Sequence, residues 1–204
     1  MFTSIVAIVI GYLFGSISFS ILFALWLRKI DIRQYGSGNA GATNTLRVLG
    51  KGPALCVFLL DFAKGSVAAG IGFWLGENSW IPVLCGLAAI AGHNWPIFFR
   101  FKGGKGIATT VGALAVWGVL PTLIAGLIAI AIIALTKYVS LGSLVLAVLL
   151  PILFAIFGAD GPFIWGAAFV GAIAILRHRR NIVKLLNGTE NKLGSGKKGV
   201  RHGA

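Results

Sequence analysis

Long apolar runs separated by short polar segments dominate the chain. A helix that spans a membrane needs about 20 mostly apolar residues. The apolar run at residues 107–136 has no charged residue and is longer than one span requires. A glycine and a proline within residues 118–121 are a place where it can divide into two short helices. Five further runs meet or nearly meet the required length, and they are residues 3–27, 53–75, 79–99, 140–157 and 162–176.

The positions of the basic residues decide how many spans the apolar runs make. Cytoplasmic loops of membrane proteins collect Lys and Arg. If residues 107–136 form two helices, 17 of the 18 Lys and Arg residues fall on one side of the membrane, and only Lys64 lies inside a run. If they form one helix, the basic C-terminal segment falls on the opposite side from the other basic loops. We therefore predict an all-α integral membrane protein with seven transmembrane helices, the N-terminus outside and the C-terminus cytoplasmic.

Composition agrees with a membrane protein. Hydrophobic residues make up 57% of the chain and charged residues 11%, with 18 Lys and Arg against 5 Asp and Glu and a net charge of +13. A nucleic-acid-binding domain is also basic but is not this apolar, so no nucleic-acid partner is expected. We expect residues 1–193 to form a single membrane domain, and residues 194–204 to form a disordered basic tail.

The first polar segment, residues 36–47, is rich in Gly, Ser, Thr and Asn and ends at Arg47. It contains a GxGxxG pattern, but no strand–helix–strand unit surrounds it, so a dinucleotide fold is not indicated. Small residues let backbone N–H groups approach an anion, and the hydroxyl groups and Arg47 add further donors. The alternative is a flexible polar loop. We favour phosphate binding.

Two further polar segments carry cations. Residues 102–106 place Lys105 between glycines at the start of an apolar run, and Gly106 stands where a Walker A motif requires Ser or Thr. An anion site is expected there because the positive charges of the lysines lie next to the free N–H groups at a helix N-terminus. Residues 177–181 follow the last apolar run, where topology alone calls for basic residues. His178 and Asn181 lie three apart and so share one helix face.

Two charged residues inside one apolar run form a candidate buried pair. Asp61 and Lys64 lie three apart and can neutralise one another on a helix face. Unpaired charges within a membrane are costly, so this pair is expected to face the interior of the bundle. We expect Asp61, Lys64 and His93 to support the glycine loops, and ligand contact is the alternative. Nothing in the chain has the spacing of a metal site or of a GxSxG nucleophile, so no metal is predicted.

Taken together, these segments resemble the bacterial acyl-phosphate-dependent glycerol-3-phosphate acyltransferase family (PlsY). The resemblance extends over residues 1–193 and rests on the order and spacing of several motifs. Ser18 stands where many members of the family have proline. The motifs are residues 15–17, 36–47, 61–65, 92–96 running into 101–109, and 177–182.

The resemblance implies an enzyme of the bacterial inner membrane with its active site facing the cytoplasm. Such an enzyme transfers a fatty acyl group from acyl phosphate to the 1-position hydroxyl of glycerol 3-phosphate. The products are lysophosphatidic acid and phosphate, and the step is the first acylation of phospholipid biosynthesis. No cofactor is implied, and the partners are the two substrates and the lipid bilayer.

The resemblance also assigns site residues. The family's catalytic positions match Ser37, Arg47, Lys105, His178 and Asn181 in this sequence. The base that accepts the hydroxyl proton stays open between the phosphate of glycerol 3-phosphate and His178. Substrate-binding residues are expected in both glycine loops and near the start of the run at residue 140, and they are Gly38, Asn39, Gly41, Thr43, Asn44, Gly103, Gly104, Ser140 and Ser143.

Two other functions share some of these features. A phosphate or organophosphate transporter would also have basic glycine loops and membrane helices, but it would need polar residues that continue to the outer side, where few occur. A non-catalytic lipid scaffold would leave the glycine loops unexplained. A monomer is predicted because no GxxxG-type helix face stands out.

Overall fold

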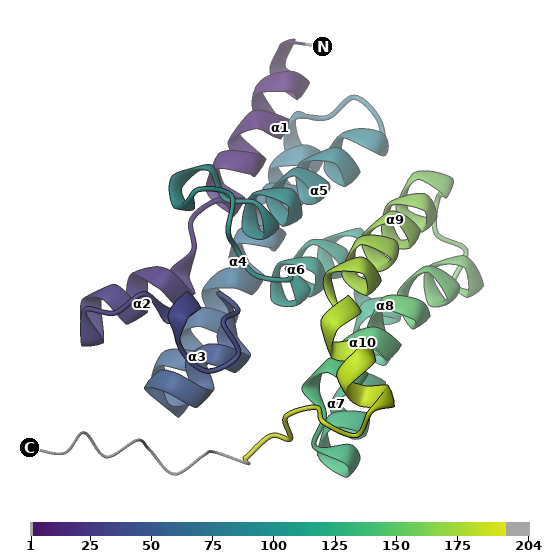
Figure 1. Ribbon diagram of the computed structural model, residues 1–204. Helices are drawn as coiled ribbons and strands as arrows, with labels where there is room; N and C mark the ends of the chain where they lie inside the picture. Colours follow the sequence, from purple (N-terminus) through teal and green to yellow (C-terminus); the bar gives the residue numbers. More distant parts are fainter. Residues whose placement is uncertain (1, 195–204) are drawn as a thin grey trace, which may run out of the picture.

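The computed structural model describes residues 2–194, and within these residues all regular secondary structure is helical (Figure 1). The N-terminal half contains α1 (Phe2–Gly15), α2 (Phe19–Arg28), α3 (Ala42–Leu49), α4 (Lys51–Leu75) and α5 (Trp80–Asn94). The C-terminal half contains α6 (Ile107–Trp117), α7 (Val119–Thr136), α8 (Val139–Ile156), α9 (Gly161–Arg177) and α10 (Arg179–Leu186). Two short 3-10 helices, Ile32–Gln34 and Ile97–Phe99, lie in the polar segments.

Five helical segments are long and apolar enough to cross a membrane: Phe2–Arg28, Lys51–Leu75, Trp80–Phe99, Val119–Thr136 and Val139–Ile156. A sixth is reached if α9 and α10, which are bent by 61° relative to one another, count as one span. The apolar helix α6 has 11 residues. At 1.5 Å per residue it rises about 16 Å, roughly half of a hydrocarbon core. The number of seven spans and the orientation of the chain therefore stay predictions.

The predicted division of the run at residues 107–136 is confirmed. Helix α6 ends at Trp117 and α7 begins at Val119, and Gly118 between them has an extended backbone. The break leaves α6 short, and it lets α7 leave in a new direction to pack against α8. The charge distribution in the sequence required this division.

The predicted span over residues 3–27 corresponds to the candidate span Phe2–Arg28, whose helix is interrupted within its length. Helix α1 ends at Gly15 and α2 begins at Phe19, so the backbone is interrupted at three residues. The interruption leaves the carbonyl of Ile17 without a helical partner, and the Lys64 ammonium on α4 donates to it at 2.7 Å. This contact is not apparent from the sequence, because it joins residues 47 positions apart.

Helices α4 and α6 cross at close distance through two glycines. A Cβ atom added to Gly65 of α4 would lie 2.1 Å from the Thr109 carbonyl oxygen of α6, and one added to Gly112 would lie 2.0 Å from that of Phe62. Only glycine permits this approach, in the manner common to membrane helices. Helix α6 is thereby held against α4, and this contact fixes the start of α6 next to the polar loops.

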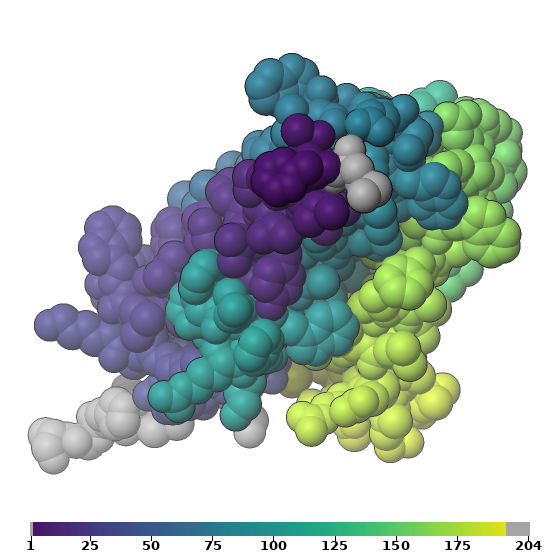
Figure 2. Space-filling view, turned by 90° about the horizontal axis from the view of Figure 1, so that it is seen from above, coloured from purple at the N-terminus to yellow at the C-terminus, as the bar shows by residue number. Residues whose placement is uncertain are grey.

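The other side of α6 packs into an apolar core with α8 and α9. Trp117, Phe154 and Phe163 are all buried in this core, and the Trp117 indole donates to the Pro82 carbonyl of α5 at 3.2 Å. Figure 2 shows α9 and α10 along one side of the molecule, beside the N-terminal helices. The predicted disordered tail, residues 194–204, lies outside the described residues except for Gly194.

Candidate functional site

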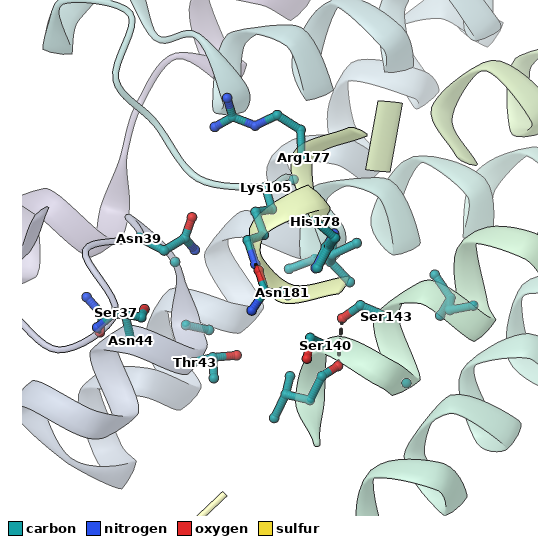
Figure 3. A pocket seen from close by; sticks show the side chains of 18 of the residues that line it. Ser37, Asn39, Thr43, Asn44, Lys105, Ser140, Ser143, Arg177, His178 and Asn181 are labelled. Atoms are coloured by element: carbon teal, nitrogen blue, oxygen red, sulfur yellow. Dashed lines mark hydrogen bonds between the residues drawn. The ribbon is translucent and has the colours of Figure 1, made fainter. Parts of the chain in front are cut away.

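A cavity of about 680 Å³ lies where the polar segments meet the helices (Figure 3). One end is polar and the other end is lined by apolar side chains of α4, α6, α7 and α8. Lys64 and Gly104 are the two predicted site residues that do not line it. The predicted residues that do are Ser37, Gly38, Asn39, Gly41, Thr43, Asn44, Arg47, Asp61, His93, Gly103, Lys105, Ser140, Ser143, His178 and Asn181.

Asn44 holds the first glycine segment, residues 36–47, in shape. Its side chain is fully buried, and its amide nitrogen donates to the carbonyls of Ile32 and Tyr35 at 3.1 and 3.0 Å. Its amide oxygen accepts from the backbone N–H of Ser37 at 2.8 Å. These bonds occupy the amide, so the structure gives Asn44 a loop-holding role, and its predicted contact with substrate stays a prediction.

The second glycine segment, residues 102–106, packs directly on the first. A Cβ atom at Gly104 would lie 2.3 Å from the Ala40 carbonyl oxygen and 2.3 Å from Nε2 of His93. The N–H group of Gly104 donates to the His93 carbonyl at 3.1 Å. The Gly104 amide is therefore used within the protein, and the residue does not line the cavity, so its predicted contact with substrate stays a prediction.

Arg177 fixes the second glycine segment from the other side. Its guanidinium donates to the Gly104 carbonyl and lies over the ring of Trp95, 5.4 Å from the centroid. Its sequence position, at the end of the last apolar run, is explained by topology alone. We did not single out Arg177 from the sequence, because its partner lies 73 positions away.

A second arginine links the two glycine segments. Arg33 donates to the carbonyls of Phe99 and Lys102 at 2.9 and 3.2 Å, and Asp31 accepts two of its remaining hydrogens. The Arg33 guanidinium lowers the pKa of the Asp31 carboxyl, chiefly through these hydrogen bonds. This pair, which the sequence did not mark either, holds the two loops at a fixed separation.

Lys105 lies at the centre of the polar end. Its ammonium donates to the Asn181 amide oxygen, and the Asn181 amide nitrogen donates to the Glu190 carboxylate at 2.8 Å. Figure 3 shows the Lys105 and Asn181 side chains pointing toward one another. Burial lowers the pKa of the Lys105 ammonium to about 8, and the nearby Glu190 carboxylate acts in the opposite direction. The sequence predicted Lys105 and Asn181, but not Glu190.

His178 and two serines complete the polar end. His178 is buried between α9 and α10, and its Nδ1 lies 2.7 Å from the Ala174 carbonyl oxygen. Since a carbonyl oxygen only accepts, Nδ1 carries a proton and Nε2 is the ring nitrogen left for a ligand. Ser140 and Ser143 are buried on α8, and the Ser143 hydroxyl donates to the Val139 carbonyl at 2.9 Å (Figure 3).

Asp61, Lys64 and His93 form a buried ionic cluster next to the cavity. The Lys64 ammonium lies 2.8 Å from Oδ1 of Asp61, and Nδ1 of His93 lies 3.4 Å from the same oxygen. These residues connect the interruption after α1 to α4 and α5, and His93 in turn contacts Gly104 through its backbone. The supporting role predicted for these residues stays a prediction, because Asp61 and His93 also line the cavity. Within residues 2–194, no three His, Cys, Asp or Glu side chains are grouped so as to hold a metal ion.

The fold and the cavity together define an α-helical membrane protein with a cavity whose lining is rich in cationic side chains. The family model described as glycerol-3-phosphate acyltransferase matches residues 5–188. Proteins named glycerol-3-phosphate acyltransferase in Shouchella clausii and Halalkalibacterium halodurans are 53% and 52% identical to this chain. These alignments cover 95% and 92% of the chain, and 98% and 94% of the two relatives.

Solved structures agree with the sequence relatives. Two crystal structures of PlsY, an integral membrane glycerol 3-phosphate acyltransferase, match with 38% identity over 94% of this chain. The glycerol 3-phosphate form has a TM-score of 0.89 over 96% of its chain, and the lysophosphatidic acid form has 0.87 over 95%. The chain therefore belongs to the glycerol-3-phosphate acyltransferase family, and it is an integral membrane acyltransferase of the PlsY type.

Proposed function

We propose that the enzyme transfers a fatty acyl group from acyl phosphate to the 1-position hydroxyl of glycerol 3-phosphate. The two-ended cavity carries this proposal: Arg47 and Lys105 lie at the polar end, and apolar side chains line the other. Both substrates carry a phosphate, and one also carries an acyl chain. The related PlsY structures are named for their glycerol 3-phosphate and lysophosphatidic acid forms, which correspond to one substrate and one product of this reaction.

The apolar end of the cavity suits a lipid tail. Phe58 of α4 and Ile130 of α7 line it, and both are also exposed at the surface of the helices, by 41% and 63%. In a bilayer such side chains face lipid, so an acyl chain has a sideways path from the membrane to the polar end. This path supports a membrane-resident acyl donor over a soluble one.

In the proposed mechanism the glycerol hydroxyl attacks the acyl carbonyl carbon directly. A new carbon–oxygen bond forms, the bond from the acyl carbon to the phosphate oxygen breaks, and phosphate leaves. Acyl phosphate is already an activated anhydride, so no covalent enzyme intermediate is required. Ser37, Arg47 and Lys105 hold the phosphates and offset the charge that develops in the transition state.

The remaining residues of the polar end orient the acceptor. His178 and Asn181 hold the glycerol, while Ser140 and Ser143 line the same space from α8. The N–H group of Gly103 and the side chains of Asn39 and Thr43 face the donor phosphate. Gly38 and Gly41, whose N–H groups donate to the carbonyls of Tyr35 and Asn39, shape the loop around it.

The phosphate of glycerol 3-phosphate is our choice of base. Its second pKa is near 6, so it is available to accept the hydroxyl proton at neutral pH. His178 is a weaker choice because burial lowers the pKa of its ring, and the positive charges of Lys105 and Arg177 act in the same direction.

His178→Ala should therefore raise KM for glycerol 3-phosphate by about tenfold, the cost of one orienting hydrogen bond, and change kcat little. The pH dependence of kcat should be retained. Steady-state kinetics between pH 6 and 9 measure both quantities. A loss confined to kcat that also removes its pH dependence would show that His178 is the base.

The pH dependence of kcat/KM should report Lys105. Because burial lowers its pKa to about 8, the ammonium is present below that pH and is lost as the pH rises through it. The value of kcat/KM for glycerol 3-phosphate should fall in the same range, since this ratio reports groups of the free enzyme. Lys105→Arg keeps its charge throughout, so its remaining activity should show no such fall. A fall that persists in this variant would assign the alkaline limb to another group.

We further propose that the enzyme is a monomer in the bacterial inner membrane, with seven spans, no cofactor and its polar end toward the cytoplasm. The concentration of Lys and Arg in the segments around the cavity supports this orientation. The short α6 then crosses only as part of a packed bundle, covered by α4 and α9.

One assay tests the proposed function. Purified protein is incubated with an acyl phosphate and radiolabelled glycerol 3-phosphate, and labelled lysophosphatidic acid is extracted. Product formation with an acyl phosphate, and none with the corresponding acyl-CoA, is the expected result. Folded protein that forms no product, but moves labelled glycerol 3-phosphate into sealed vesicles, would support the transporter alternative instead.

A further inference from the structure

The cavity contains a carboxylate among its cations. Two acidic residues line it, Asp61 and Glu190, and the Asp61 carboxylate is paired with Lys64. Glu190, which follows α10, is therefore the acidic residue of the cavity lining that lies at the polar end. The basic residues that line the cavity are Arg47, Lys105, Arg177, Arg179, Arg180 and Lys184.

Glu190 contacts the residues that we assign to phosphate and glycerol. Its Oε1 accepts from the Asn181 amide nitrogen at 2.8 Å, and the same amide binds the Lys105 ammonium through its oxygen. Its charge also acts on Lys105 directly. Its Oε2 is buried and has no hydrogen-bond partner within residues 2–194. A carboxylate with one free, buried oxygen beside an ammonium occupies a position that suits a phosphate oxygen.

A short segment, residues 187–193, holds Glu190 at the cavity. At its start, the N–H of Thr189 donates to the Lys184 carbonyl at 2.8 Å. At its end, the N–H of Leu193 donates to the Lys137 carbonyl at 2.7 Å, next to the start of α8. The segment, which we name the strap, is thus tied to α10 on one side of the cavity and to the α7–α8 turn on the other. Glu190 lies between the two ties.

We propose that the Glu190 carboxylate competes with phosphate for the Asn181 and Lys105 side chains. Glu190 contacts this pair in the free enzyme and gives up the contact when a substrate phosphate binds. This inference rests on the proposed function, in which the same pair binds substrate. A phosphate dianion and the Glu190 carboxylate repel one another when they share these donors. Phosphate binding is therefore weakened, and the return of Glu190 helps inorganic phosphate and the phosphorylated product to leave.

Glu190→Gln tests this proposal because it removes the charge and keeps an oxygen that accepts from Asn181. Inorganic phosphate is the probe, and its affinity is measured by isothermal titration calorimetry in detergent at pH 6.5. This pH lies well below the pKa of about 8 of Lys105 in the wild type, which leaves a margin for the lower pKa expected when the Glu190 charge is removed. We expect phosphate to bind about tenfold more tightly to the variant, and KM for glycerol 3-phosphate to fall. Unchanged or weaker phosphate binding would overturn the proposal.

Glu77→Gln is the matched control. It makes the same change of charge in the link between α4 and α5, and it should leave phosphate affinity unchanged. Equal tightening in both variants would mean that net charge alone is responsible, which would also overturn the proposal. Acyl transfer by the wild-type protein is measured in parallel. An inactive wild type would contradict the proposed function, whereas an active wild type with no effect of Glu190→Gln contradicts this inference alone.

A measurement on the unaltered protein keeps the proposal testable if Glu190→Gln does not fold. Hydrogen exchange of the strap is followed by mass spectrometry with and without saturating phosphate. Displacement of Glu190 should loosen the strap, so the amides of Thr189 and Leu193 should exchange faster with phosphate present. Slower or unchanged exchange would show that phosphate and Glu190 do not compete.

Discussion

Lys105→Ala is expected to reduce acyl transfer by about 10²–10³-fold, the usual cost of removing one transition-state donor from a preorganised site. The Lys105 ammonium is held between glycines just before α6 and is fixed by the Asn181 amide. Arg47→Ala should have a similar effect, because Arg47 lines the same polar end. Labelled lysophosphatidic acid formation by the purified variants is the measurement.

Lys102→Ala is the control for this loss. Lys102 lies in the same glycine segment, but its side chain is exposed and it does not line the cavity. It should retain most of the activity. Thermal unfolding of the Lys105 and Arg47 variants should match that of the wild type. Turnover close to wild type after Lys105→Ala would show that the cavity does not hold the reacting phosphate at this residue.

The sequence was informative where one physical rule acts locally. The positive charges around residues 107–136 required a break, and the break lies at Gly118. The glycine-rich composition of the two polar segments indicated a close backbone approach, and Gly104 does lie against Ala40. Periodicity placed His178 and Asn181 on one face, and both line the cavity.

The sequence failed where a role depends on a distant partner. Arg177 and Arg33 look like ordinary topology-determining cations, and only their contacts with carbonyls in the second glycine segment distinguish them. The N–H group of Gly104 donates to the His93 carbonyl, a contact that the sequence does not indicate. Glu190 is a lone acid in a basic segment, and this contrast was the one signal that could have led to it.

The length of α6 illustrates the same limit for the fold. Counting apolar residues treats every run alike, whereas the close approach of Gly65 and Gly112 places α6 inside the bundle, covered by protein. A helix in that position does not need the full length that lipid exposure demands. Length alone therefore cannot decide whether α6 crosses the membrane, and the charge distribution remains the argument for seven spans.

Asp61→Asn should lower the free energy of unfolding by about 3–5 kcal/mol, because it leaves the buried Lys64 ammonium without its counter-ion. Lys64 is fully buried, and its other partner is the neutral Ile17 carbonyl. The same change also weakens the contact between the Lys64 ammonium and the Ile17 carbonyl, which holds residues 16–18 against α4. Titration with dodecyl sulfate in mixed micelles unfolds the protein and measures the loss in free energy of unfolding.

The double variant Asp61→Leu/Lys64→Met separates a charge effect from a packing effect. Removing both charges eliminates the uncompensated ion, so the double variant should be more stable than either Asp61→Asn or Lys64→Met alone. If the pair only fills space, the two single losses should instead add. If the pair also positions the glycine segments through His93, the double variant should recover stability without recovering full activity, because the carboxylate beside His93 is gone. Recovery of both would limit the pair to stabilising the fold.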